Sequence, residues 1–240
     1  MAKSRRIWEL DALRGICVLG MVVVHLLYDL SAMFNLIDLQ GNELYDIISQ
    51  WGGVLFLLIS GISVTLGHHP IRRGLIVFAA GLLVTLVTTG MYLTGMAGKS
   101  IIIYFGVLHC LGICMLLWPL FKRLPAWLLA VLGLALSVFG LYVYFNIRVE
   151  TEYLYWLGFM YRGFASSDYF PLLPYFGFFL IGAFIGKTLY KKKTSLLPKV
   201  NERFFLIRFF SFCGRQSLWI YLLHQPLLTG AIELYLLITR

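Results

Sequence analysis

The stretch Leu13–Leu30, LRGICVLGMVVVHLLYDL, is apolar enough to lie inside a lipid bilayer. Its length approaches the about 20 residues that one membrane-spanning helix needs. It nevertheless contains Arg14, His25 and Asp29, side chains that the hydrocarbon core of a bilayer normally excludes. This combination predicts a transmembrane helix with a functional polar face.

The composition of the whole chain is that of a membrane protein. Of its 240 residues, 60% are hydrophobic and only 13% are charged, which is outside the usual range of soluble domains. Apolar runs recur along the chain, so we predict an all-α polytopic membrane bundle of about seven helices, forming one domain over residues 1–240. The predicted spans are 13–35, 50–67, 74–93, 101–121, 126–146, 170–190 and 216–238.

Basic residues are distributed unevenly between the connections that alternate along these spans. With a cytoplasmic N-terminus, the external side keeps only Lys99, Arg148, Arg162 and Arg240. This pattern predicts a cytoplasmic N-terminus and an external C-terminus. It also accounts for the net charge of +9 without nucleic acid, which we do not expect as a partner. The cytoplasmic segments would hold Lys3, Arg5, Arg6, Arg72, Arg73, Lys122, Arg123, Lys191, Lys192, Lys193, Lys199, Arg203, Arg208 and Arg215.

The four cysteines all fall in or beside predicted helices, at Cys17, Cys110, Cys114 and Cys213. Cys110 and Cys114 share a helix face beside His109, an arrangement that would allow a metal site. Packing of small residues between helices explains them more simply, and we expect no metal and no disulfide framework.

The polar residues of the first predicted span lie on one helix face. Arg14 and His25 are eleven positions apart, which is about three turns. At a rise of about 1.5 Å per residue, His25 lies roughly 16 Å deeper than Arg14 and close to the bilayer midplane. Asp29 follows one turn later, and we expect it to orient His25 and raise its basicity.

Two further histidines are predicted at a similar depth. His109 is about eight residues into the fourth span and His224 is about nine residues into the seventh. Three histidines and an aspartate at one level indicate a polar cavity. The alternative is that each ring is satisfied by neighbouring helices and is structural. Gln225 and Pro226 follow His224, and Pro226 either widens the cavity or serves helix packing.

Two connecting segments carry further candidate residues. The external segment 146–169 is rich in aromatic residues, which indicates a membrane interface. Near its end, Asp168 either stabilises the N-terminus of the sixth helix or, with Arg162, faces an acceptor substrate. The cytoplasmic run RFFLIRFF at 203–210 predicts a short helix at the headgroup layer, for which anchoring to anionic lipid is the simplest role.

As a set, five segments resemble the bacterial branch of the heparan-alpha-glucosaminide N-acetyltransferase catalytic family. They are Trp8–Gly15 leading to His25, Leu57–Ser63, Phe105–His109, Asp168–Pro174 and Ser217–Pro226. Arg14 followed by His25 is also similar to the arginine–histidine signature of family-three membrane acyltransferases, which modify envelope glycans. The resemblance implies a transmembrane acyltransferase of the bacterial cytoplasmic membrane that passes an acetyl group from cytoplasmic acetyl-CoA to an acceptor.

The resemblance also implies roles for individual residues. It makes His25 the central histidine and Arg14 its cytoplasmic-side partner. In the lysosomal members the reactive histidine lies in the external loop after this helix, and an asparagine matches His25. Residues 35–49 contain no histidine here, so we assign the reaction to His25 as base or acyl carrier, with Asp29 and His109 beside it.

Substrate contacts are expected on both sides of the membrane. Arg14, Arg72 and Arg73 would bind the phosphates of CoA, because bidentate arginine suits phosphate. For Arg72 and Arg73 the alternative is ordinary solvated loop charge. The acceptor, an amine or hydroxyl of an envelope sugar, would contact Asp168, Arg162, His224 and Gln225.

Two other functions fit the same residues. Intramembrane histidines and aspartates relay protons in proton-coupled transporters, although carriers commonly contain internal repeats and this chain has none. A helical scaffold could also hold haem through two histidines. The expected partners are acyl-CoA, the acceptor and the lipid bilayer. The sequence leaves open the acceptor, the choice between direct transfer and acyl-histidine, and the oligomeric state.

Overall fold

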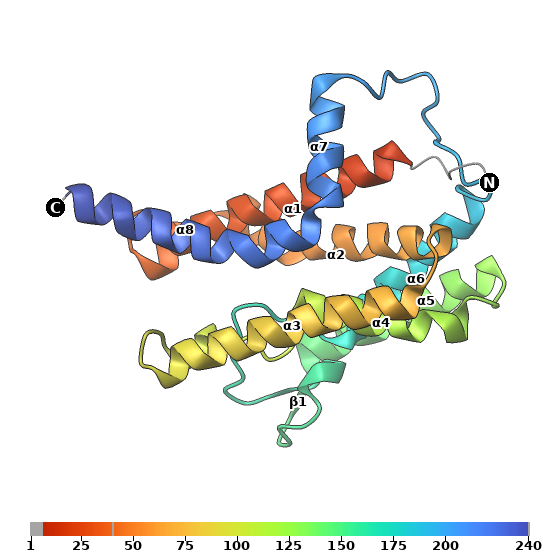
Figure 1. Cartoon of the computed structure of the whole chain (residues 1–240). Coiled ribbons are helices and arrows are strands. Elements are labelled where there is room, and N and C mark those ends of the chain that lie inside the picture. The colour runs from red at the N-terminus through yellow and green to blue at the C-terminus, as the bar shows by residue number, and fades with distance from the viewer. Residues whose placement is uncertain (1–6, 40, 240) are drawn as a thin grey trace. The chain divides into compact units, whose positions relative to one another are not determined.

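The computed structural model describes residues 7–39 and 41–239, and its regular structure is almost entirely helical (Figure 1). Two short strands, β1 (Arg148–Val149) and β2 (Met160–Tyr161), form a parallel pair. Lys3, Arg5, Arg6 and Arg240, which contributed to the predicted orientation, lie outside the described residues. The helices are α1 (Trp8–Tyr28), η1 (Asp29–Met33), α2 (Glu43–Leu66), α3 (Pro70–Leu93), η2 (Lys99–Ile101), α4 (Val107–Phe121), α5 (Ala126–Asn146), η3 (Tyr155–Leu157), α6 (Leu172–Thr188), α7 (Phe205–Arg215) and α8 (Ser217–Thr239).

Five of the described helices are long and apolar enough to cross a membrane: α1 with η1, α2, α3, α5 and α8. Helices α4 and α6 are apolar but shorter, with 15 and 17 residues. Large apolar side chains are exposed on the long helices, among them Leu86 and Leu237 at 70% and 77%. A surface in contact with lipid has this character. The predicted all-α membrane bundle is confirmed in outline, whereas the count of seven spans and the sides of the termini stay predictions.

The chain divides into two compact units, one formed by Met1–Phe56 with Thr194–Arg240 and the other by Leu57–Lys193. In the first unit α1 packs against α7 and α8. In the second unit α5 packs against α6, and α3 packs against α4. Helix α2 contributes residues to both units.

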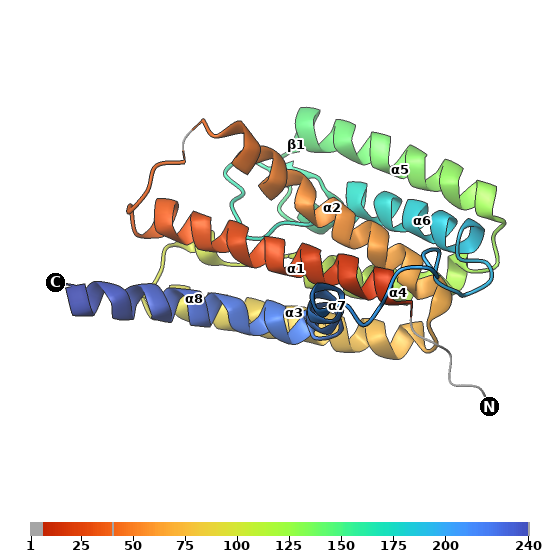
Figure 2. The same ribbon diagram turned by 90° about the horizontal axis from the view of Figure 1, so that it is seen from above.

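A close backbone approach fixes α7 on α1 within the first unit. Gly15 of α1 faces the carbonyl of Phe210, and Gly214 of α7 faces the carbonyl of Asp11. A Cβ atom at either glycine would overlap with that oxygen, so only glycine permits the crossing. In both ribbon views α7 stands across α1 and α8 rather than along them (Figures 1 and 2).

In the second unit, α4 is stabilised at both ends. Asp168 Oδ2 accepts a hydrogen bond from the N–H of Val107, the first residue of α4, at 3.1 Å. At the other end Lys187 Nζ donates to the carbonyls of Lys122 and Leu124 at 2.7 and 2.6 Å. An anion at the N-terminus and a cation at the C-terminus both interact favourably with the helix dipole.

Candidate active site

Four polar side chains meet inside the first unit: His25 and Asp29 from α1 and η1, and His224 and Gln225 from α8. Gln225 Nε2 donates to both carboxylate oxygens of Asp29, at 2.8 and 2.9 Å. The rings of His25 and His224 meet edge to face, with centroids 4.9 Å apart and planes inclined by 70°. We call these four residues the histidine cluster. It lies on two helices that are apolar enough to cross a membrane.

Each histidine of the cluster directs Nδ1 to a backbone carbonyl of its own helix. The ring of His25 bonds to the carbonyl of Met21 at 2.9 Å, and that of His224 bonds to the carbonyl of Tyr221 at 2.5 Å. A carbonyl oxygen can only accept, so Nδ1 carries the hydrogen in both rings. In the neutral rings Nε2 therefore keeps its lone pair, with which it can take a proton or attack an acyl carbon.

Two acceptor atoms of the cluster are buried without a hydrogen-bond partner: Nε2 of His224 and Oε1 of Gln225. The side chain of His224 is only 9% exposed. An unpaired buried polar atom costs about 1–3 kcal/mol, and in native proteins such atoms call for a specific explanation, such as catalysis. A ligand that donates N–H or O–H groups would pair with them.

The sequence predicts that Asp29 orients His25, but the hydrogen bonds of the two side chains go to other partners. Its carboxylate is fully buried and is held by Gln225. The ring of His25 is held instead by the carbonyl of Met21. The residues predicted to act together are thus brought together, but the aspartate positions α8 and the backbone of α1 sets the histidine tautomer.

The backbone is irregular beside the cluster on both helices. Asp29 begins the π-helical turn η1, in which the N–H of Phe34 donates to the Asp29 carbonyl five residues earlier, at 2.9 Å. Helix α8 continues through Pro226, which offers no N–H to the carbonyl of Leu222. Local π geometry inside a helix is frequent at functional sites.

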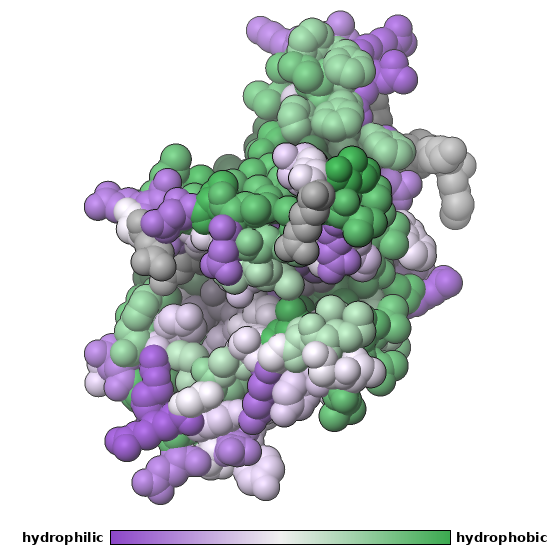
Figure 3. Space-filling model, turned by 90° about the vertical axis from the view of Figure 1, so that its left-hand side faces the viewer, coloured by the Kyte–Doolittle hydropathy of each residue, from purple (hydrophilic) through white to green (hydrophobic). Residues whose placement is uncertain are grey.

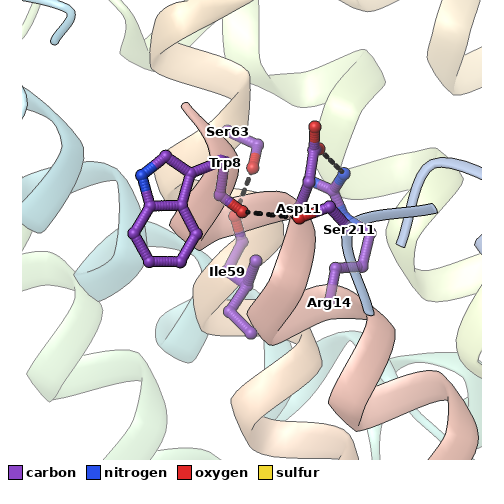
Figure 4. Close-up of polar contacts among 6 residues, drawn as sticks. All are labelled: Trp8, Asp11, Arg14, Ile59, Ser63 and Ser211. Carbon is purple, nitrogen blue, oxygen red and sulfur yellow. Dashed lines mark hydrogen bonds and ion pairs between the residues drawn. The ribbon is translucent and has the colours of Figure 1, made fainter. Parts of the chain in front are cut away.

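Arg14 lies near the beginning of α1, beside the crossing with α7. Its Nη1 is 3.5 Å from Asp11 Oδ1, and both side chains are 16% exposed. Figure 4 shows this pair together with Ser211 of α7, whose hydroxyl donates to the carbonyl of Trp8 at 3.3 Å. The guanidinium is therefore held on the first turns of α1, where it can meet an anionic ligand.

His109 has a different environment in the second unit. Its Nδ1 accepts from the N–H of Gly106 at 3.2 Å, so its hydrogen is on Nε2. Nε2 is 3.3 Å from Thr85 Oγ1, which in turn donates to the carbonyl of Ile103 at 2.6 Å. Both ring nitrogens are occupied and the ring is 3% exposed. This geometry favours a structural role over the catalytic role predicted for His109.

The remaining predicted contacts also lie in the second unit. Arg72 and Arg73 are exposed in the first turn of α3, where unpaired backbone N–H groups also favour anions. Arg162 is exposed, whereas Asp168 is 9% exposed and accepts from Val107. Asp168 thus stabilises the N-terminus of α4.

Glu9 was not among the residues predicted from the sequence. Its side chain is 6% exposed, Oε1 accepts from the N–H of Leu196 at 2.7 Å, and Oε2 is buried without a partner. The carboxylate therefore ties the segment before α7 to the first turn of α1. Its position inside the Trp8–Gly15 motif was the available signal.

Within 7–39 and 41–239, no group of three or more His, Cys, Asp or Glu residues is arranged to hold a metal ion. Cys110 and Cys114 are free thiols with their sulfur atoms 3.9 Å apart. The ring contact between His25 and His224 leaves no space for a haem between them.

The model of the heparan-alpha-glucosaminide N-acetyltransferase catalytic family matches residues 6–226. The chain belongs to this family. The match confirms the resemblance to the family and includes the whole histidine cluster. No significant match is found among curated proteins or solved structures.

Membership of the heparan-alpha-glucosaminide N-acetyltransferase catalytic family indicates a transmembrane acetyltransferase, and acetyl-CoA is the donor that this family uses in general. The apolar helices fit a protein embedded in a lipid bilayer. Such a reaction needs a base or a nucleophile. In the histidine cluster, His25 and His224 each keep a lone pair on Nε2 for this purpose.

Proposed function

We propose that the protein transfers an acetyl group from cytoplasmic acetyl-CoA, across the membrane, to an amine or hydroxyl of an envelope sugar. Family membership supports the reaction class. The observation that carries the assignment to the histidine cluster is the contact between two histidine rings that both keep Nε2 free. Acyl transfer needs a nitrogen of this kind to act on the thioester and to take the acceptor proton.

His25 is the residue that acts first in this proposal. As an acyl carrier, its Nε2 attacks the thioester carbonyl carbon, the C–N bond forms as the C–S bond breaks, and CoA leaves as the thiolate. As a base, it removes the proton from the acceptor, which attacks the thioester carbonyl carbon directly; the C–S bond then breaks and CoA leaves as the thiolate. Both routes use the same lone pair, which the bond from Nδ1 to Met21 keeps available.

His224 and Gln225 receive the acceptor in this proposal. Their buried unpaired atoms, Nε2 and Oε1, are acceptors, so they suit an amine or hydroxyl that donates hydrogen. The two hydrogen bonds from Gln225 to Asp29 fix the amide group, and with it the position of His224 one residue earlier. Asp29 therefore acts as a positioning residue.

Arginines supply the contacts to CoA. Arg14 is fixed at the start of α1, the end of the helix that we place at the cytoplasmic surface. Arg72 and Arg73 on the first turn of α3 are separate candidates for the phosphates, because the helix N-terminus and the guanidinium groups favour the same anion. Arg162 stays a candidate for the acceptor side, whereas the bond from Val107 favours a capping role for Asp168. The proposal includes seven spans in one transferase domain, with the N-terminus in the cytoplasm.

The test uses the purified full-length protein in lipid nanodiscs with radiolabelled acetyl-CoA. Glucosamine is the amine probe and methyl glucoside is the hydroxyl probe. The expected result is slow hydrolysis of acetyl-CoA without an acceptor and faster consumption with one of the probes. His25→Ala should lower both rates by about 10²–10⁴-fold, whereas His68→Ala, in an exposed loop, should not.

Each outcome separates the hypotheses. An acetyl group found on the intact protein after incubation without acceptor, and absent in His25→Ala, identifies the acyl-carrier route. Unchanged turnover in folded His25→Ala removes His25 from the mechanism. Proton-driven solute uptake into vesicles without consumption of acetyl-CoA would replace the transferase by the transporter.

A further inference from the structure

We propose that α7 is an in-plane membrane helix that binds anionic phospholipid at the bilayer surface near the start of α1. The proposal concerns a surface outside the histidine cluster. It rests on the direction of α7, on the side chains that α7 exposes, and on the contacts that hold it in place.

The direction of α7 is set by its contacts with α1. The paired approach of Gly15 and Gly214 leaves no space for rotation or translation of one helix past the other. Ser211 adds a hydrogen bond to the carbonyl of Trp8 at 3.3 Å. Figures 1 and 2 show that α7 stands across α1 and α8 and projects away from both. If α1 and α8 cross the bilayer, α7 must lie along its plane.

The position at which α7 crosses α1 indicates how deep α7 lies in the bilayer. The contacts involve residues 8–15, the first two turns of a 21-residue helix. Helix α7 therefore leaves α1 close to one end of its span, at the level of the lipid headgroups rather than in the middle of the bilayer. Glu9 holds the preceding segment at the same end, by its bond to Leu196.

The exposed surface of α7 and the residues just before it is amphipathic. Four phenylalanines are exposed between 44% and 74%: Phe204, Phe205, Phe209 and Phe212. In Figure 3 the uppermost part, which α7 and the preceding loop form in Figure 1, is mostly green with purple side chains at its edge. Such a helix lies in the interface, with its apolar side toward the acyl chains.

The charges of this segment decide the occupant. Arg203, Arg208 and Arg215 are exposed within the same thirteen residues as the phenylalanines. Glu202 directly precedes this run, and 203–215 itself contains three arginines and no acidic residue. Phosphate groups of anionic lipid complement this charge, and each basic residue near such a surface contributes a factor of about five in binding. A second copy of the chain would bring the same positive charge to the same face, and so fits less well.

The test compares a fluorescent label on the exposed face of α7 with a label in the loop that precedes it. In full-length Cys17→Ser protein, NBD is attached to Phe205→Cys or, as the matched control, to the exposed loop position Lys199→Cys. The protein is placed in nanodiscs of phosphatidylcholine with or without phosphatidylglycerol, and brominated lipids serve as quenchers. We expect strong quenching at position 205 and weak quenching at position 199, with more quenching at 205 when phosphatidylglycerol is present.

Retention of phosphatidylglycerol by the purified protein in detergent tests the arginines. Arg203→Gln with Arg208→Gln should lower retention by about fivefold for each arginine removed, whereas Lys99→Gln, at an exposed position outside this segment, should leave retention unchanged. An unquenched, water-exposed label at 205 would overturn the proposal. So would cross-linking of Phe205→Cys between two copies in place of quenching, because a second copy would then cover the face. Acetyl-CoA turnover is a separate readout, so the transferase proposal is judged independently.

Discussion

Gln225 Nε2 lies within hydrogen-bond distance of both carboxylate oxygens of Asp29, and so joins α8 to the π turn that follows α1. The two residues are 196 positions apart in the chain. Asp29 is fully buried, so the amide group of Gln225 replaces water as the partner of a charged group.

Gln225→Leu should destabilise the protein, because it leaves the carboxylate of Asp29 buried without this donor. The expected cost is about 1–3 kcal/mol, measured as a lower thermal unfolding midpoint in detergent. Gln216→Leu, at an exposed position just before α8, is the control and should change little. The double variant Asp29→Leu with Gln225→Leu should recover stability, because both polar partners are then absent. Equal midpoints for Gln225→Leu and Gln216→Leu would show that the bond contributes nothing.

His224→Asn tests the roles of the two ring nitrogens separately. Asparagine can still donate to the Tyr221 carbonyl as Nδ1 does, but it has no atom equivalent to Nε2. We expect acetyl transfer to glucosamine to fall by about 10²–10⁴-fold, while acetylation of His25 from acetyl-CoA persists. The two activities are measured with labelled acetyl-CoA, with and without the sugar. A variant that transfers at the normal rate would leave His224 without a role in proton removal.

Two glycines of the same helix should respond in opposite directions to alanine. At Gly15 the new methyl group would meet the carbonyl of Phe210, so Gly15→Ala should cost about 1–3 kcal/mol or more. At Gly20 nothing lies within 4 Å, and Gly20→Ala should gain up to about 1 kcal/mol from helix propensity. Unfolding midpoints of the two variants give the comparison. If Gly15→Ala is as stable as Gly20→Ala, the close crossing of α1 and α7 does not exist.

Asp168 should prove to be a helix cap rather than a substrate contact. Asp168→Ala removes the acceptor of the Val107 N–H and should cost about 0.5–2 kcal/mol, whereas Asp168→Asn keeps an acceptor and should cost less. Arg162→Ala, at an exposed site, is the control. The result that contradicts this role is normal stability in Asp168→Ala with a raised KM for the acceptor sugar.

The sequence was informative where a property repeats along one helix. The run around Leu13–Leu30 predicted a membrane-spanning helix, and counting residues along the helices predicted a similar depth in the bilayer for His25 and His224. The structure brings these two rings to 4.9 Å. The basic, phenylalanine-rich run at 203–210 was expected to be a short helix, and α7 begins there.

The sequence was less informative about pairs of distant residues and about helix ends. Val107, whose N–H donates to Asp168, is 61 positions away in the chain, and no local pattern pairs these two residues. The fourth span was expected to begin at 101, but α4 begins at Val107, because Gly106 has an extended backbone and its N–H bonds to His109. The tautomers of the three histidines depend on which backbone group each ring meets, and spacing alone does not encode this.

The wide turn at η1 has a geometric effect on everything after it. A π turn accommodates one more residue than an α turn, so side chains beyond it are rotated by about 100° relative to an uninterrupted helix. The polar face that starts at Arg14 therefore cannot extend past Asp29 in a straight line. Deleting one residue between Leu30 and Met33 would restore regular winding and redirect Phe34 and its successors around the axis, leaving the two histidines and the amide–carboxylate pair in place.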